Sequence, residues 1–245
     1  MQLFGKFSTN FDMDYLSEHY IYISKDEDDK ISTKELESML KKKRKTVAGT
    51  IFLYNPEVSP KGYKPSRFLK NDGFEDYDSF VELNETQRDY LLNSALKQHH
   101  KGKLVEIKYL FAYNRENIEP TFVLEEFNSD LDKLTSSQLT RYDKNLNYLD
   151  IPNIRLSGKF VFFGIGHKYD RHHKAIIKYA HSLSAHVQKL DKTMVFMYDN
   201  NYDLQEAKDL AYFLSPFATG KAKDLRANTF RQVFSTNPPQ TLKAV

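Results

Sequence analysis

The sequence contains no cysteine and no tryptophan, and it has only 9 glycines and 8 prolines among 245 residues. Without cysteine the chain can form no disulfide and can offer no thiolate for catalysis or metal binding. No apolar run approaches the roughly 20 residues that span a bilayer. The start, MQLFGKFSTNFDMD, lacks the basic and apolar segments of a secretory signal. These absences favour an intracellular protein.

Positive charge is concentrated in the last third of the chain. Residues 1–150 carry 22 Lys+Arg against 26 Asp+Glu, whereas residues 151–245 carry 14 against 7, within a formal net charge of +3. A local positive field favours anionic partners such as nucleic acid or phosphate groups. A basic domain without such a partner accounts for the charge equally well.

The first part of the chain combines helix and strand patterns. Ser32 with Glu35 three positions later forms a capping-box pattern, which predicts a helix from Thr33 to Lys43. The basic run KKKRK at its end resembles an address tag, but cations at a helix C-terminus are electrostatically favourable, and we prefer that interpretation. The remaining patterns predict a strand in TVAGTIFLY, a long loop at 55–78, a helix at 85–98, and strands at 103–113 and 120–127.

The last part of the chain alternates more clearly between strand patterns and helix patterns. KFVFFG is typical of a buried strand, and Asp170 caps a predicted helix in DRHHKAIIKYAHSL. A second helix, DLQEAKDLAYFL, has an apolar side made of Leu204, Ala207, Leu210, Ala211 and Leu214. We further expect strands in AHVQKL (185–190) and TMVFMY (193–198), a fourth strand between residues 215 and 226, and a final helix in ANTFRQVF with Phe230, Val233 and Phe234 facing inward.

The polar stretch 129–153, which ends near Pro152, marks the predicted boundary between these parts. The sequence therefore predicts an α/β protein with an α+β domain at 1–130, a linker at 131–153, a four-stranded parallel sheet flanked by helices at 154–237, and a tail at 238–245.

The order strand, helix, strand, strand, helix, weak strand, helix over residues 155–236 resembles a BRCT domain. The likeness lies in LSGKFVFFG, DRHHKAIIKYAHSLSAHVQKL, TMVFMYDN, EAKDLA and ANTFRQVF, where Phe230 takes the place of the usual tryptophan. The resemblance implies four parallel strands flanked by helices and a non-catalytic module that recognises phosphorylated peptides, DNA ends or partner domains.

The same resemblance implies a phosphate site. In phosphate-binding members a glycine after the first strand, an arginine in the first helix and a lysine in the second helix surround the phosphate, and Gly164, Arg171 and Lys208 match those positions. Phe163 stands where those members have Ser or Thr. Backbone N–H groups at a helix start attract anions, so we predict a site of Gly164, Arg171 and Lys208 with Lys168 and Lys174 beside it.

No other motif predicts chemistry. The glycines of GIG lack the third glycine of a dinucleotide fingerprint, because Tyr169 stands there. His172 and His173 are neighbours that point about 100° apart on a helix, and the pairs His99–His100 and His167–His173 lack further ligands at a useful spacing. We expect no catalytic residues, no metal and no cofactor.

The predicted function is that of a non-catalytic BRCT-containing adaptor in DNA replication or repair. Its expected partner is DNA or a phosphorylated or DNA-bound protein, in the cytoplasm, nucleoid or nucleus, and no membrane. Two alternatives stay open: a DNA-processing enzyme with its chemistry in residues 1–130 and the BRCT-like module for targeting, and a purely protein-binding scaffold.

Overall fold

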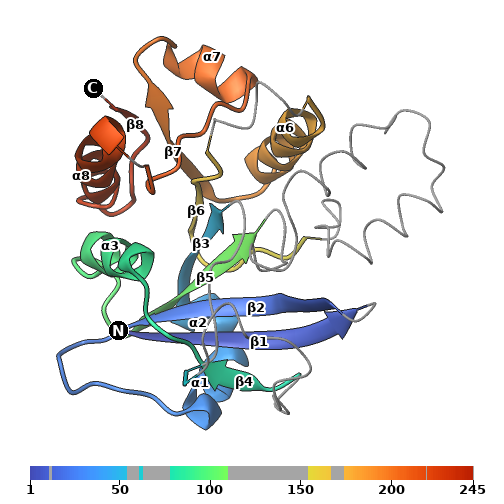
Figure 1. Ribbon diagram of the computed structural model, residues 1–245, viewed down its shortest axis with the longest axis vertical. Coiled ribbons are helices and arrows are strands. Elements are labelled where there is room, and N and C mark those ends of the chain that lie inside the picture. The colour runs from blue at the N-terminus through green and yellow to red at the C-terminus, as the bar shows by residue number, and fades with distance from the viewer. Residues whose placement is uncertain are drawn as a thin grey trace.

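The strands follow the apolar segments of the chain and join into a single mixed sheet (Figure 1). The computed structural model describes residues 1–10, 13–53, 61–62, 78–109, 154–166, 174–218 and 220–244. Within these residues the sheet has eight strands in the order β4-β1-β2-β5-β3-β6-β7-β8. The strands are β1 (Gln2–Asn10), β2 (Met13–Ile23), β3 (Val47–Leu53), β4 (Phe80–Glu82), β5 (Lys103–Tyr109), β6 (Phe160–Phe163), β7 (Thr193–Asp199) and β8 (Leu242–Ala244).

The sheet has an antiparallel side and a parallel side. β4, β1, β2 and β5 pair antiparallel. β5, β3, β6, β7 and β8 pair parallel. Strand β5 belongs to both sides, so the sheet is continuous from edge to edge.

The described helices are α1 (Thr33–Leu40), α2 (Lys43–Thr46), α3 (Gln87–Leu96), α6 (Lys174–Gln188), α7 (Leu204–Asp209) and α8 (Lys223–Val233). Helices α3 and α8 lie side by side on one face of the sheet (Figure 1). There Phe230 of α8 and Phe234, the residue that follows the helix, pack on the ring of Phe162. Leu36 of α1 packs on Tyr20, and Ser184 of α6 contacts Met194, on the opposite face. The fold is therefore mixed α/β, with helices on both faces.

Local signals explain where the helices begin. Ser32 accepts a hydrogen bond from the amide of Glu35, whose carboxylate accepts from the amide of Ser32, so the predicted capping box is confirmed. Thr86 and Asp89 form a second box at the start of α3. Such boxes satisfy amides that a helix start leaves unpaired.

Two predicted strands are wrong. AHVQKL is not a strand, because α6 continues to Gln188 and buries Leu183 and Val187, one turn apart, on the same side. Within 215–226, the described residues form no strand, and a short 3₁₀ turn at Gly220–Ala222 leads directly into α8. The predicted strands in TVAGTIFLY and KFVFFG, the helix at 85–98 and the inward side of the last helix are confirmed.

The helix predicted at 203–214 is shorter than expected. α7 ends at Asp209, Ala211 has a positive φ of 54°, and Leu204 and Leu210 are exposed instead of buried. Ala207 and Leu214 are buried as predicted.

The predicted boundary does not separate two sheets. The predicted linker, 131–153, and the strand predicted at 120–127 lie outside the described residues. On either side of them, β3 and β6 are direct neighbours, with Gly49 opposite Phe160 and Ile51 opposite Phe162. Gly158 precedes β6 with a φ of +74° and lies against the backbone of Ala48, where any side chain would collide. Residues 242–244 of the predicted tail form β8 at the edge of the same sheet.

Candidate functional site

The carboxyl ends of β3 and β6 form a topological switch point. After β3 the chain passes through β4, at the far edge of the sheet, and then through α3 to β5 on one side, and after β6 it passes through α6 to β7 on the other. The two helices lie on opposite faces of the sheet. In sheets of this kind, ligands bind in the crevice outside the carboxyl ends where neighbouring connections diverge. A ligand site is therefore expected at this edge of the sheet.

A glycine turn follows β6 at this switch point. Gly164 is buried, and its amide donates to the carbonyl of Phe52 in β3 at 2.8 Å. A Cβ at Gly164 would lie 3.0 Å from Pro216 and 3.3 Å from Leu53, so only glycine fits here without displacement. Gly166 has a φ of +95°, and its amide donates to the carbonyl of Phe213 at 3.0 Å. The turn is thus tied both to β3 and to the segment after α7.

The structure places some of the predicted phosphate-binding residues. Lys168 and Arg171 lie outside the described residues, and Lys174 is the first residue of α6 as described. Lys208 is partly exposed on α7, which begins shortly after β7 and therefore at the same edge of the sheet as Gly164. Because the amide of Gly164 is already bonded to Phe52, an anion at this turn would be held by other donors. The predicted grouping of the five residues stays a prediction.

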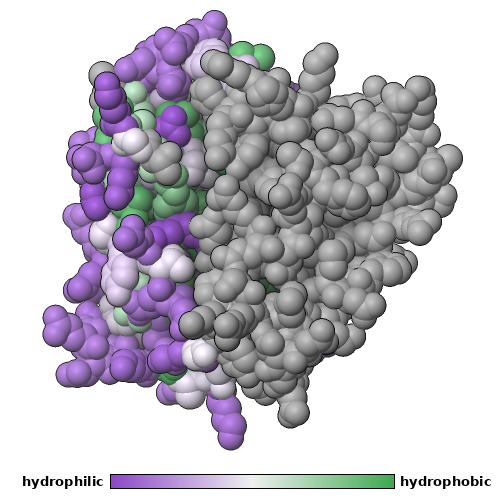
Figure 2. Space-filling model, in the orientation of Figure 1, coloured by the Kyte–Doolittle hydropathy of each residue, from purple (hydrophilic) through white to green (hydrophobic). Residues whose placement is uncertain are grey.

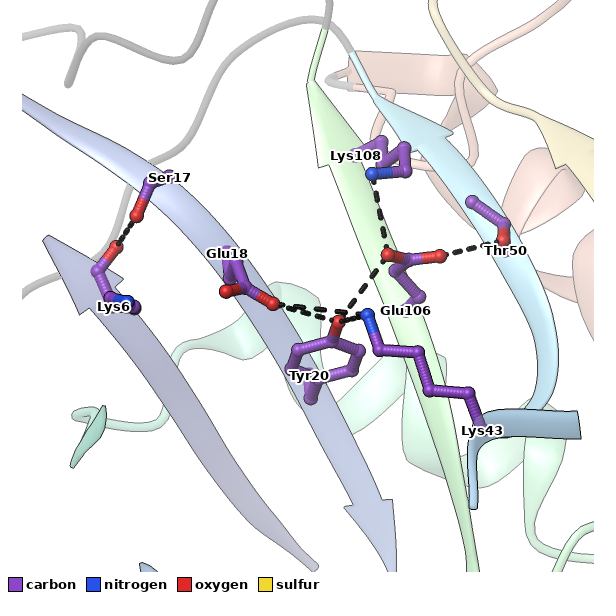
Figure 3. Close-up of polar contacts among 8 residues, drawn as sticks. All are labelled: Lys6, Ser17, Glu18, Tyr20, Lys43, Thr50, Glu106 and Lys108. Carbon is purple, nitrogen blue, oxygen red and sulfur yellow. Dashed lines mark hydrogen bonds and ion pairs between the residues drawn. The ribbon is translucent and has the colours of Figure 1, made fainter. Parts of the chain in front are cut away.

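A second group of polar residues lies on the face of the sheet that carries α1 and α6 (Figure 3). Glu106 of β5 is 5 % exposed, and its carboxylate lies 3.3 Å from the ammonium group of Lys108 and 3.2 Å from the hydroxyl of Thr50. The Tyr20 hydroxyl lies 3.0 Å from Glu18 and 3.4 Å from Glu106, and it accepts a hydrogen bond from Lys43 at 2.6 Å. We call this group the Glu106 network; it comprises Glu18, Tyr20, Lys43, Thr50, Glu106 and Lys108.

The Glu106 network is balanced in charge and in hydrogen bonds. It contains two carboxylates and two ammonium groups, and each buried oxygen has a partner. Burial, with the nearby carboxylates of Glu106 and Glu18, raises the pKa of Tyr20 far above its ordinary value. A hydroxyl so difficult to ionise serves as a neutral donor and acceptor. The network therefore connects β2, β5, β3 and α2 as a structural element.

A third group lies on the opposite face, where α3 begins. The ring of His19 is 1 % exposed and stacks on Tyr109, with 2.7 Å between its Nδ1 and the tyrosine hydroxyl. Nη2 of Arg88 donates to the same hydroxyl at 3.1 Å. The guanidinium carbon lies 5.8 Å from the ring centroid of Tyr109 and 5.6 Å from that of Phe217. We call His19, Arg88, Asp89, Tyr109 and Phe217 the Arg88 cluster.

The Arg88 cluster differs electrostatically from its surroundings. Burial, with the adjacent positive charge of Arg88, lowers the pKa of His19 to about 3, so the imidazole is neutral near pH 7. Burial also raises the pKa of Asp89, whose Oδ2 accepts from the amide and hydroxyl of Thr86. Nε2 of His19 and Oδ1 of Asp89 are buried and have no hydrogen-bond partner in the described parts of the chain. Buried polar atoms of this kind usually form hydrogen bonds with water or with a ligand.

Sequence reasoning missed both groups. A signal for the Glu106 network was present, because a glutamate inside the apolar strand KLVEIKY must be paired if it is buried. No comparable signal marked Arg88, since its aromatic neighbours come from residues 109 and 217. Only the fold brings these side chains together.

The described part of the face drawn in Figure 2 is mainly polar. Figure 2 shows hydrophilic residues over most of the described part of this face, with smaller hydrophobic areas in its upper half. Among the described residues, no group of three or more His, Asp or Glu side chains could hold a metal ion. In the same parts of the chain, no helix has the length and apolar character required to cross a membrane.

Comparison of the chain with protein-family models, with curated proteins and with solved structures found no match.

Proposed function

We propose that this protein is a non-catalytic, BRCT-like adaptor that binds DNA by its phosphates at the carboxyl ends of β3 and β6. The observation that carries the proposal is the glycine turn at this switch point, Gly164–Gly166, followed at once by the basic residues that lead into α6. Anions favour such a place because the side chains are cationic and a helix start presents unpaired N–H groups.

The arrangement of the strands supports the BRCT-like part of the proposal. Four neighbouring strands, β3, β6, β7 and β8, are parallel and have helices on both faces. Residues 154–244 supply three of them, and β3 from the first part of the chain is the fourth. The module proposed here thus includes two strands from outside the region of resemblance at 155–236, β3 from the first part of the chain and β8 from the predicted tail.

The charge distribution favours DNA over a phosphorylated protein. An excess of positive charge over the whole last third suits a long polyanion, whereas one phosphorylated side chain needs only a local pocket. Lys208, Lys223 and Lys243 lie on three different elements of this part.

The experiment measures the affinity of the full chain for a short DNA duplex between 50 and 200 mM salt, for Arg171→Ala and Lys208→Ala. Each lost phosphate contact should weaken binding and reduce the salt slope by about 1. Lys189→Ala is the matched control, because this exposed lysine follows α6 and precedes β7, at the opposite edge of the sheet.

Wild-type affinity and slope in both test variants would refute the DNA site. Binding to a phosphopeptide in preference to its unmodified form and to the duplex would also refute it, and would assign the site to a phosphorylated partner. Turnover of the duplex by the purified chain would favour the enzyme alternative.

A further inference from the structure

The amino ends of three neighbouring strands carry a group of exposed basic side chains. β5, β3 and β6 are parallel and adjacent in that order, so their first residues lie along one edge of the sheet, opposite the edge at which Gly164 lies. The basic residues at this edge are all exposed, and each lies at the start of one of these strands or in the few residues before it: Lys42, Arg44, Lys45, Lys101, Lys103 and Lys159. We call these six residues the basic edge.

Hydrogen bonds hold the three segments of the basic edge together. The ammonium group of Lys103 donates to the carbonyl of Lys45 at 2.6 Å. The amide of Lys159 donates to the carbonyl of Ala48 at 2.8 Å. Neighbouring strands lie about 4.8 Å apart, so β5, β3 and β6 distribute these cations along roughly 10 Å of the edge. The fold therefore collects cations from segments that are distant in the sequence.

The C-terminus of α1 does not account for the charges of the run KKKRK. The helix ends with Lys41 as its cap, and its last turn contains no basic residue. A helix terminus attracts cations only within about one turn, which leaves Arg44 and Lys45 unexplained. Lys43 points to the Tyr20 hydroxyl and belongs to the Glu106 network (Figure 3). The other members of the run are thus exposed charges without a structural role of this kind.

The basic edge has a defined extent. Among the residues that the structure describes, none of its six cations forms an ion pair. The acidic loop 26–29 follows β2, the strand that neighbours β5 on its other side. Lys192, which precedes β7, is partly buried and donates to the carbonyl of Gly158. The unpaired positive charge therefore extends from β5 to β6 and is bounded by carboxylates at the β2 end.

A linear polyanion fits this surface better than a membrane. Phosphates follow one another about every 3.4 Å along each strand of a duplex, so roughly 10 Å of edge faces about three of them. Binding to a membrane surface combines basic side chains with exposed apolar ones. None of the large apolar residues that are exposed in the described parts of the chain belongs to α2 or to the starts of β3, β5 and β6; these residues are Tyr90, Leu204, Leu210 and Leu225.

We propose that the basic edge binds the sugar–phosphate backbone of a nucleic acid, independently of the site at the β6 turn. Contacts from exposed cations to phosphates carry no base information, so this binding does not depend on base sequence and weakens steeply with salt. The basic edge and the β6 turn lie at opposite edges of the sheet. Removal of either surface therefore leaves the other in place.

The experiment measures the affinity of the full chain for a DNA duplex and an RNA duplex of equal length between 50 and 200 mM salt. The test is the double variant of Lys45→Gln and Lys159→Gln, which removes one cation before β3 and one before β6. The salt slope should fall by about 2 and the affinity by about tenfold. The preferred duplex identifies the natural nucleic acid. The double variant of Lys34→Gln and Lys61→Gln is the charge-matched control, because these exposed lysines lie in α1 and beside Glu82 of β4.

The acidic loop provides a variant whose expected effect is a gain. The double variant of Asp26→Asn and Asp28→Asn removes two exposed negative charges at the β2 end of the basic edge. Both duplexes should then bind more tightly, because repulsion of the phosphates is reduced. A damaged fold would not produce such a gain. Unchanged or weaker binding would contradict the proposed position of the nucleic acid.

Wild-type affinity and slope in the Lys45 and Lys159 double variant would overturn the inference, and so would an equal loss in the control variant. A loss in this double variant, together with wild-type binding in Arg171→Ala and Lys208→Ala, would keep the basic edge and refute only the β6 site. The reverse result would refute only the basic edge. Binding to phosphatidylserine vesicles that the double variant loses, without binding to either duplex, would assign the surface to a membrane and overturn the proposal.

Discussion

The two buried polar groups lie on opposite faces of the same strands, and they are built differently. In β5, Glu106 belongs to the Glu106 network, whereas Tyr109, an odd number of residues later, points to the other face and belongs to the Arg88 cluster. The network contains equal numbers of positive and negative groups, each with a partner. The cluster leaves a buried imidazole nitrogen and a buried carboxylate oxygen without partners in the described residues.

The two groups therefore differ in how completely their buried polar atoms are paired within the described residues. A network whose hydrogen bonds are complete is not stabilised further by a ligand. Removal of one member leaves the other members buried and unpaired. A cluster with unpaired buried polar atoms is stabilised by any water or ligand that forms hydrogen bonds with them. Substitutions in the network should therefore reduce stability more than comparable substitutions in the cluster.

The largest effect is expected for Glu106→Ala. It leaves the Lys108 ammonium and the buried hydroxyls of Tyr20 and Thr50 without their shared acceptor, so the free energy of unfolding should fall by about 3 kcal/mol. Tyr109→Phe in the Arg88 cluster removes a hydroxyl that is hydrogen-bonded to His19 and Arg88, and it should cost about 2 kcal/mol, the value of two ordinary hydrogen bonds.

Urea denaturation of both variants and the wild type measures this difference. Glu82→Ala is the control, because Glu82 forms a partly exposed ion pair with Lys61. A loss for Glu106→Ala no greater than that for Glu82→Ala would contradict the structural role of the network.

The next effect concerns pH. Burial lowers the pKa of His19 to about 3 and that of His100 to about 4, from an ordinary value of 6.5. Because the unfolded chain binds protons at these sites more readily, their contribution to stability is complete above pH 6.5 and is lost as the pH falls toward 4. Each histidine should remove up to about 1.4 kcal/mol per pH unit in this range.

Unfolding free energies at pH 7, 6 and 5 measure the slope. His100→Gln should reduce it, whereas His181→Gln, a change of an exposed histidine, should leave it unchanged. The Glu106 network contains no histidine, so a dependence of this kind arises on the α3 face. A stability that is constant from pH 7 to pH 5 would contradict the burial of both imidazoles.

The smallest effect is expected for Lys43→Met at the margin of the Glu106 network. Lys43 donates to Tyr20, but its ammonium group lies 3.9 Å from Glu18 and its side chain is 39 % exposed. Exposed ion pairs contribute at most about 1 kcal/mol, so the thermal midpoint should fall only slightly. Lys42→Met is the control, because Lys42 is an exposed residue next to Lys43 in the chain. A loss as large as that of Glu106→Ala would show that the network depends on its exposed end.

Local patterns predicted much of the secondary structure and little of the assembly. The capping residue Ser32 and the apolar segment of β6 act through near neighbours, so the sequence reveals them directly. AHVQKL was misassigned because Val187 continues the helical spacing from Leu183, and a short apolar segment fits either structure. The three-residue strand β8 carries too short a pattern to be recognised.

The candidate site was only partly predictable for the same reason. Gly164 follows an apolar strand and could be identified from that pattern. Arg88 becomes distinctive only when β5 and the segment after α7 lie beside it, and nothing near residue 88 encodes that approach. The junction of β3 with β6 likewise depends on a pairing between distant segments, which a local pattern does not record.

The pairing of β3 with β6 also constrains how the chain is made. Strand β3 leaves the ribosome more than a hundred residues before β6. At ordinary rates of synthesis, the edge of β3 that pairs with β6 therefore stays unpaired for a time on the order of ten seconds. That edge carries Ile51 and Phe52 and offers unbonded peptide groups to any other extended chain. Nascent molecules of this protein should therefore depend on chaperones during this interval, and slower synthesis of residues 54–159 should increase aggregation more than slower synthesis after β6.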